Sequence, residues 1–264
     1  MDFHISPGMI DTHFHASVMQ KKGLDAVMLL QSAFDAGLSR GIDIGLTPSD
    51  FAGRKSLLKD FPSILLSAGC YPSETERAET ISLLTELEEI LEKENPSAIG
   101  EIGLDWHWDY GTRKQQKDLF AGQIALANKY NLPVLVHNRE ADDDVVDILE
   151  AVPPKAGGIL HCFSSDYETA RKVVDCGLYI SFAGNLTYTK NEFLRTTAAK
   201  LPIERVLLET DSPYLSPQKR RGKPNHPGHI GYTYEVLSEV LNMEMEVLIL
   251  RMDKNFRKLF SSGS

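Results

Sequence analysis

The sequence predicts an α/β protein that folds as a single (β/α)8 barrel, also called a TIM barrel. Short β-branched or apolar runs alternate with longer amphipathic segments along the chain, and eight such units fit into its 264 residues. Alternating strands and helical segments indicate βαβ units and a parallel sheet, and about 250 residues is typical of a closed eight-stranded barrel. We therefore expect one domain over residues 1–264, with an open, doubly wound sheet as the alternative.

Eight runs have the length and composition of buried strands. They are residues 8–13, 41–46, 64–70, 98–103, 133–137, 158–161, 178–182 and 205–209. The clearest helical patterns between them are residues 76–94, 114–130, 141–151 and 167–176. Asn95 precedes a proline and should end its helix, and Gly37, Asn131 and Gly177 stand where left-handed residues terminate helices. Residues 212–230 lack periodicity, which predicts a long functional or disordered loop.

Composition limits the classes of protein to which the chain can belong. The hydrophobic share of 42% and the charged share of 25% are those of a globular protein with a sizeable core. Disordered and fibrous classes are therefore excluded. The net charge of −9 argues against bulk electrostatic binding to nucleic acid, although a local basic groove remains compatible with it.

Cysteine spacing and the apolar runs bear on the compartment. Cys70, Cys162 and Cys176 show no CxxC spacing, so we expect reduced thiols rather than disulfides or a Cys-type zinc site. The first residues do not have the pattern of a signal peptide, and no apolar run approaches the roughly 18 residues of a membrane helix. We therefore expect a cytoplasmic protein without membrane segments.

The first chemical motif is Asp11-Thr12-His13-Phe14-His15, at the end of the first predicted strand. Strand side chains alternate between faces, so His13 and His15 point the same way. Two imidazoles two residues apart at the carboxyl end of a strand can hold one divalent ion together. An isolated pair of this kind is weak support, and its weight depends on what the other strands carry.

Four more residues of metal-binding type lie on or just after later strands: Glu101, His137, His161 and Asp211. In a parallel barrel the carboxyl ends of the strands meet on one face, where barrel active sites are found. Six nitrogen and oxygen ligands exceed the needs of one tetrahedral zinc and suit two divalent ions bridged by a carboxylate. Glu101 is the predicted bridge, because it lies centrally in the strand order and has the longer side chain. This ligand set admits zinc, manganese, iron or magnesium.

These motifs, taken in order, resemble the TatD family of metal-dependent deoxyribonucleases, within the wider amidohydrolase-type hydrolases. The matching stretches are residues 10–15 (IDTHFH), 98–105 (AIGEIGLD), 133–139 (PVLVHNR), 161–164 (HCFS), 207–217 (LLETDSPYLSP) and 221–225 (RGKPN). The resemblance implies a (β/α)8 barrel. It also implies one metal held by His13, His15, Glu101 and Asp211, another held by Glu101, His137 and His161, and a phosphate contact from Arg139.

One position departs from the family pattern. Many members carry a histidine after the Gly69-Cys70 pair, and this chain has Tyr71. A phenol still donates a hydrogen bond, so Tyr71 remains a candidate substrate-binding residue. Its ordinary pKa near 10 makes it a poor proton shuttle at neutral pH. The replacement of the common glycine by Ser165 is a lesser change.

The resulting hypothesis is hydrolysis of DNA phosphodiesters, in exonuclease mode, at a site with two divalent ions (Mg2+, Mn2+ or Zn2+). Asp211 and Glu101 are the predicted catalytic residues. Asp211 orients and deprotonates a metal-activated water, and the metals and Arg139 stabilise the phosphoryl charge. The basic run at residues 219–223, which includes Arg221, is expected either to bind the DNA backbone or to be a solvated loop. Trp106, Trp108 and Tyr110 either stack on bases or are buried beneath the loop.

Two other functions remain open. The same metals could hydrolyse a small amide, ester or lactone, as they do in relatives of the wider superfamily. Relatives that bridge their metals with a carboxylated lysine carry it on the fourth strand, where this chain has Glu101, so the nuclease branch is favoured. A catalytically inactive binding barrel should have lost a ligand, and all six are present. DNA is the expected partner, and a monomer suffices.

Overall fold

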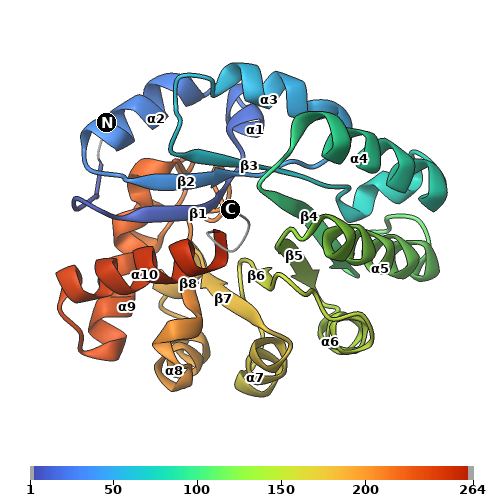
Figure 1. Ribbon diagram of the computed structural model, residues 1–264. Coiled ribbons are helices and arrows are strands. Elements are labelled where there is room, and N and C mark those ends of the chain that lie inside the picture. The colour runs from blue at the N-terminus through green and yellow to red at the C-terminus, as the bar shows by residue number, and fades with distance from the viewer. Residues whose placement is uncertain (1–2, 261–264) are drawn as a thin grey trace.

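The structure is a computed structural model that describes residues 3–260. Eight parallel strands follow one another in chain order around a barrel, with helices outside them (Figure 1). The predicted closed barrel is therefore confirmed. The strands are β1 (Ile10–Phe14), β2 (Arg40–Asp43), β3 (Ile64–Ala68), β4 (Ala98–Asp105), β5 (Val134–Arg139), β6 (Gly158–Leu160), β7 (Leu178–Phe182) and β8 (Val206–Leu208).

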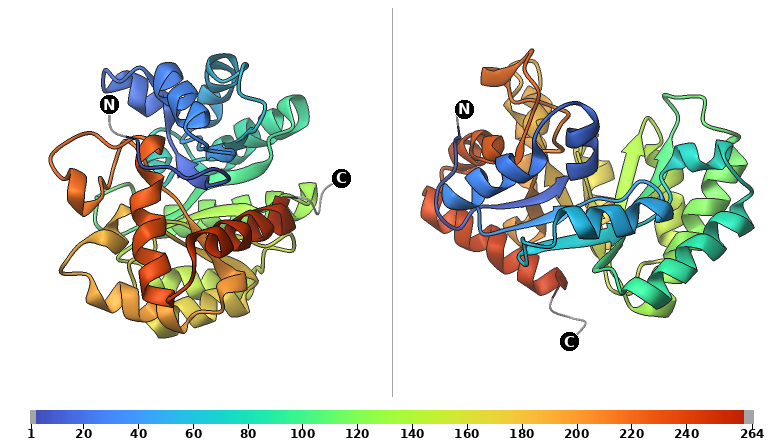
Figure 2. Two further views of the ribbon diagram at one scale, coloured as in Figure 1. Left: turned by 90° about the vertical axis from the view of Figure 1, so that its left-hand side faces the viewer. Right: turned by 90° about the horizontal axis from the view of Figure 1, so that it is seen from above.

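Ten helices are assigned within residues 3–260. They are α1 (Ala16–Lys21), α2 (Ala26–Asp35), α3 (Phe51–Leu57), α4 (Thr80–Glu94), α5 (Arg113–Tyr130), α6 (Asp142–Ala151), α7 (Tyr167–Asp175), α8 (Glu192–Lys200), α9 (Ile230–Leu241) and α10 (Met245–Phe260). Figure 2 shows this outer layer from two further sides, with the orange loop after β8 projecting at one end of the barrel. No helix in this part of the chain is long and apolar enough to cross a membrane.

Helix ends follow the local rules that the sequence suggested. Asn95 and Asn131 end α4 and α5 in the left-handed conformation, with φ of 52° and 53°, and Gly37 and Gly177 have φ of 119° and 93°. These predicted terminators are confirmed. Helix α4 begins at Thr80, later than expected, because the preceding residues 72–76 form a 3₁₀ turn with its proline at the start.

Strand lengths decide where the functional side chains stand. Strands β4 and β5 extend two residues beyond the prediction and remain paired as far as Asp105 and Arg139. Strands β6 and β8 end earlier than predicted, so His161 lies on the loop after β6, while Asp211 follows β8 as expected. The carboxyl ends of all these strands nevertheless meet at one face, and the side chains converge there.

A buried ion-pair network supports the turn after β1. Arg54 of α3 is 1% exposed, and its guanidinium donates to Asp43 Oδ2 at 2.8 Å, Asp50 Oδ1 at 2.6 Å and the Ser67 carbonyl at 2.6 Å. The other oxygen of Asp43 accepts the backbone N–H of Ala16 at 2.8 Å. The network thus connects the ends of β2 and β3 to the residue that follows His15.

The seam between β1 and β8 closes the barrel. An isolated parallel bridge joins Phe14 of β1 to Ser212 in the loop after β8. Asp11 accepts hydrogen bonds from the Thr210 backbone N–H at 2.9 Å and its hydroxyl at 2.6 Å. The backbone N–H of Asp211 donates to the His13 carbonyl at 2.9 Å. Side chains and backbone around the predicted ligands His13 and Asp211 therefore hold the first strand to the segment after the last one.

Candidate metal centre

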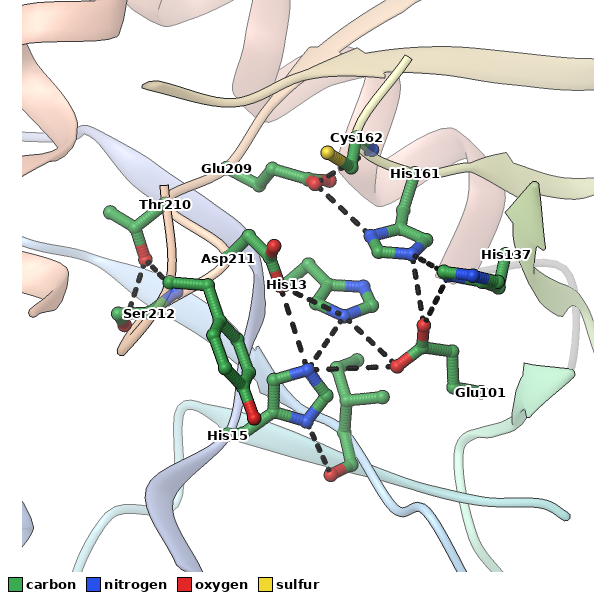
Figure 3. A network of polar contacts seen from close by, with 12 residues as sticks. His13, His15, Glu101, His137, His161, Cys162, Glu209, Thr210, Asp211 and Ser212 are labelled. Atoms are coloured by element: carbon green, nitrogen blue, oxygen red, sulfur yellow. Dashed lines mark hydrogen bonds and ion pairs between the residues drawn. The ribbon is translucent and has the colours of Figure 1, made fainter. Parts of the chain in front are cut away.

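Six side chains point toward one another at the carboxyl end of the barrel (Figure 3). They are the predicted ligands His13 of β1, His15 just after it, Glu101 of β4, His137 of β5, and His161 and Asp211 from the loops after β6 and β8. All but His137 are less than 9% exposed. The structure therefore brings together the complete set that the sequence predicted.

Glu101 lies between two groups of imidazoles. Its Oε1 is 3.0 Å from His137 Nδ1 and 3.0 Å from His161 Nε2. Its Oε2 is 3.6 Å from the Nε2 atoms of both His13 and His15. One carboxylate thus presents each oxygen to a different pair of nitrogen donors, which is the arrangement required of a bridging ligand.

Asp211 completes the group on the β1 side. Its Oδ1 is 3.8 Å from His13 Nε2 and 3.6 Å from His15 Nε2. Two sets of donor atoms, each within 4.8 Å of one another, could hold an ion: His13, Glu101 and His161, and His13, His15 and Asp211. His137 adjoins the first set, since its Nδ1 is 3.3 Å from His161 Nε2.

The far nitrogens of three imidazoles have acceptors. His137 Nε2 is 3.1 Å from Asp105 Oδ2, His161 Nδ1 is 3.3 Å from Glu209 Oε1, and His15 Nδ1 is 3.3 Å from the Ile44 carbonyl. Metal-binding histidines characteristically donate their second N–H to a carboxylate or carbonyl, which fixes the tautomer and leaves the other nitrogen free for the ion. The donor set therefore fits divalent metal ions.

Asp105 and Glu209 were not among the predicted site residues. Both lie in the motifs that led to the prediction: Asp105 is four residues after Glu101 on the same strand, and Glu209 is two residues before Asp211. Asp105 shares β4 with Glu101, and strand periodicity was its available signal, because side chains an even number of residues apart on a strand share a face. Glu209 follows the end of β8, so its signal was its place beside Asp211 in the same motif.

Burial and mutual charge set the protonation of the site. Burial tends to raise the pKa of Glu101, but His161, His13 and His137 outweigh it and hold that pKa well below its ordinary value. Burial, followed by the charge of His161, lowers the pKa of His13 to about 3, which keeps this ring neutral. Burial works against charge on His161 too, yet Glu101 raises its pKa well above the ordinary value. His13, which is neutral, and His161, which retains a proton, therefore face the same carboxylate, that of Glu101.

A cavity of about 680 Å³ is lined by five of the six predicted ligands, all but His13. Its wall includes Tyr71, whose hydroxyl donates to Asp105 Oδ2 at 3.1 Å and lies 3.2 Å from His137 Nε2. Burial, with the charges of Glu101 and Asp105, raises the pKa of Tyr71. The Tyr71 hydroxyl is therefore a hydrogen-bond donor held in place by Asp105, the carboxylate that also contacts the candidate ligand His137.

The other candidate binding residues have different surroundings. Arg139 lines the cavity, and its guanidinium lies 5.5 Å from the centre of the Trp108 ring. Arg221 is not among the lining residues; its guanidinium lies 4.7 Å from the centre of the Tyr188 ring. Its neighbour Lys219 forms an ion pair with a glutamate of α9 at 3.0 Å. Part of the basic loop is thus engaged within the fold.

Aromatic residues after β4 divide into two kinds. Trp106 donates its indole N–H to Asp144 at 3.1 Å and carries the Arg113 guanidinium 4.9 Å from its ring, so it supports the outer helices. Trp108 and Tyr110 line the cavity.

The three cysteines are free thiols, as expected, and Cys162 lies in the cavity wall.

Comparison with known proteins agrees with this geometry. A family model described as TatD related DNase matches residues 10–261. The chain is 33% identical over 257 residues to the uncharacterized metal-dependent hydrolase YabD of Bacillus subtilis, covering 96% of this chain and 98% of that protein. It is 32% identical over 257 residues to the uncharacterized metal-dependent hydrolase YcfH of Escherichia coli, covering 96% and 95%. The crystal structure of YjjV, a TatD homolog from Escherichia coli, superposes with a TM-score of 0.89 at 30% identity, covering 96% of this chain and 98% of that one. The chain therefore belongs to the TatD-related DNase family of metal-dependent hydrolases.

Proposed function

We propose that the protein hydrolyses phosphodiester bonds of DNA with two divalent ions. The observation that carries the proposal is the position of Glu101, whose two oxygens face separate groups of nitrogen donors. Two ions bridged by a carboxylate suit in-line displacement at phosphorus, because both the attacking and the leaving oxygen need stabilisation. The family description matched by the chain, TatD related DNase, favours DNA as the substrate.

The roles of the protein groups follow from their positions. Ions held by the six ligands would supply Lewis acidity that activates water and neutralises phosphoryl charge. Asp211 lines the cavity and is 8% exposed, so its carboxylate is available to orient the attacking water and accept its proton. Arg139 lines the same cavity and can donate to the non-bridging phosphoryl oxygens. Tyr71 is committed to Asp105, which assigns it to the support of His137 rather than to proton transfer.

The test is cleavage of labelled DNA by metal-stripped protein. Single- and double-stranded DNA labelled at either the 5′ or the 3′ end is incubated with added Mg2+, Mn2+ or Zn2+. We expect at least one metal to restore cleavage, and comparison of the two labels gives the polarity. If no metal restores cleavage while a small ester or amide is hydrolysed, the proposal is wrong.

Glu101→Gln tests the bridge itself. The amide keeps the size of the side chain but removes its charge, so the variant should lose both cleavage and bound metal while remaining folded. Glu140→Gln is the matched control, because the side chain of Glu140 is 63% exposed and pairs with His107 at the rim. Full activity and full metal content in Glu101→Gln would contradict the bridging role.

A further inference from the structure

Two exposed aromatic side chains stand at the cavity. Trp108 is 51% exposed and Tyr214 is 42% exposed. Of the eight large hydrophobic side chains that are at least 38% exposed within residues 3–260, these two alone line the cavity beside the metal ligands. An exposed apolar surface beside a polar site is typical of a place where a ligand binds.

The two rings lie on opposite sides of the site. Trp108 is in the loop after β4, and Tyr214 is in the loop after β8. In a ring of eight strands taken in chain order, β4 and β8 are diametrically opposed. Glu101, of β4, and Asp211, of the loop after β8, approach the same imidazole between them: each has a carboxylate oxygen 3.6 Å from His15 Nε2. A substrate whose reacting bond lies at the ligands therefore extends toward one ring on either side.

The local structure fixes the Trp108 side. The backbone N–H of Trp108 donates to Asp105 Oδ1 at 3.2 Å, and the other oxygen of that carboxylate contacts His137. The Arg139 guanidinium lies over the indole ring, and the His107 ring meets it edge-on with centroids 4.9 Å apart. The backbone of Trp108 and the side chain of the ligand His137 are thus held by the same carboxylate, that of Asp105.

The Tyr214 side is fixed in a similar way. The backbone N–H of Tyr214 donates to the Asp211 carbonyl at 2.8 Å, and its own carbonyl accepts from Asn225 Nδ2 at 2.7 Å. Lys22 Nζ lies 3.9 Å from the ring centre, and His15 meets the ring edge-on with centroids 6.1 Å apart. Each aromatic ring is therefore paired with one cation beside the site.

We propose that Trp108 and Tyr214 are stacking platforms for the two nucleobases that flank the scissile phosphate. This inference rests on the proposed function. A flat ring accepts the face of any base, so the contact does not depend on base identity. Arg139 and Lys22, the cations over the two rings, would then face the phosphates next to each stacked base. The base must have left a helical stack to reach either platform.

The experiment combines variants with abasic substrates. Cleavage is measured on a labelled oligonucleotide and on versions in which one nucleotide at a time is replaced by a tetrahydrofuran residue without a base. Loss of one stacked base should lower kcat/KM of the wild type roughly tenfold or more. Trp108→Ala should show an equal loss of kcat/KM on the complete oligonucleotide. It should show no further loss on the oligonucleotide that lacks the base stacked on Trp108 in the wild type. Tyr214→Ala should behave in the same way for the base on the other side.

Two variants serve as controls. Trp108→Phe retains a ring and should recover most of the activity lost in Trp108→Ala. Phe193→Ala removes an aromatic side chain of α8 that is 50% exposed but does not line the cavity, and it should cleave like wild type. Metal content and thermal unfolding are measured for each variant, so that a folding defect is recognised.

The outcomes separate the inference from the function on which it rests. If wild type cleaves DNA but the alanine variants and the abasic residues act independently, the platforms are wrong and the nuclease assignment stands. If wild type cleaves no DNA with any metal, both are wrong. A coupled loss at two different nucleotides, one for each ring, supports the inference.

Discussion

The Tyr71→Phe substitution isolates the hydroxyl that contacts the carboxylate beside His137. It removes one oxygen and leaves the ring in the cavity wall. The lost hydroxyl donates to Asp105 Oδ2 at 3.1 Å, and the same Oδ2 is 3.1 Å from His137 Nε2. Without this donor, Asp105 is held by fewer contacts while it orients a metal-binding imidazole.

The magnitude follows from the kind of bond that is lost. A hydrogen bond to a charged group contributes about 1.5–3 kcal/mol, and loss of an outer partner of a ligating histidine weakens metal binding roughly 10- to 100-fold. Asp105 Oδ1 still accepts the backbone N–H groups of His107 and Trp108 at 3.0 and 3.2 Å. The remaining support places the effect at the lower end, about tenfold weaker metal affinity.

Competition with a chelator measures this affinity directly. Mn2+ or Zn2+ is titrated into a mixture of protein and indicator chelator for wild type, Tyr71→Phe and Tyr110→Phe. Tyr110 lines the same cavity, and its ring packs edge-on against that of Tyr71 with centroids 6.2 Å apart, so this variant should bind metal like wild type. Wild-type affinity in Tyr71→Phe would refute the positioning role of the hydroxyl.

Three more predictions concern stability and protonation. Arg54→Met leaves the buried carboxylate of Asp43 without its ion-pair partner and should lower the free energy of unfolding by about 3–5 kcal/mol in urea titrations. Adding Asp43→Asn should recover part of this loss. An unchanged unfolding midpoint in the single variant would count against the network. Gly103→Ala places a Cβ 2.0 Å from the His137 carbonyl oxygen at a φ of +140°, so the protein should melt at a much lower temperature, whereas Gly53→Ala, with no atom within 4 Å, should not. Metal affinity should rise with pH. Because the pKa of His161 is raised, the metal-free protein holds a proton on this ring that stabilises the fold. This stabilisation is fully present below about pH 6.5 and is lost as the pH rises through the raised pKa. A metal ion that binds His161 must displace the proton. Calorimetry in two buffers of different ionisation enthalpy should detect the released proton, and identical heats would exclude its release.

The cluster of candidate metal ligands could be predicted because its signals are local. His13, His15, Glu101, His137 and His161 each lie on or beside a strongly apolar strand, and the parallel order of the strands brings their carboxyl ends together. A boundary error of one or two residues does not move a ligand to another end of the barrel. The prediction of the site was therefore more robust than the prediction of the strand limits.

The unpredicted features depend on partners that are distant in sequence. Lys219 pairs with a glutamate 16 residues away, and Arg221 covers Tyr188 from another loop. Such pairings hold basic side chains of residues 219–223 against the rest of the fold, and composition alone does not reveal them. Helices α1 and α3, of six and seven residues, are too short for a helical period to stand out in the sequence.

The β1–β8 seam has a consequence for the order in which the protein is made. Asp11 and Thr210, which hold the seam, are 199 residues apart. A growing chain carries His13 and His15 long before it gains Asp211, which follows the eighth strand. Nascent chains that stop before β8 therefore lack both the strand that closes the barrel and one of the six candidate metal ligands. Hydrolytic activity should therefore arise only when synthesis has passed the last strand.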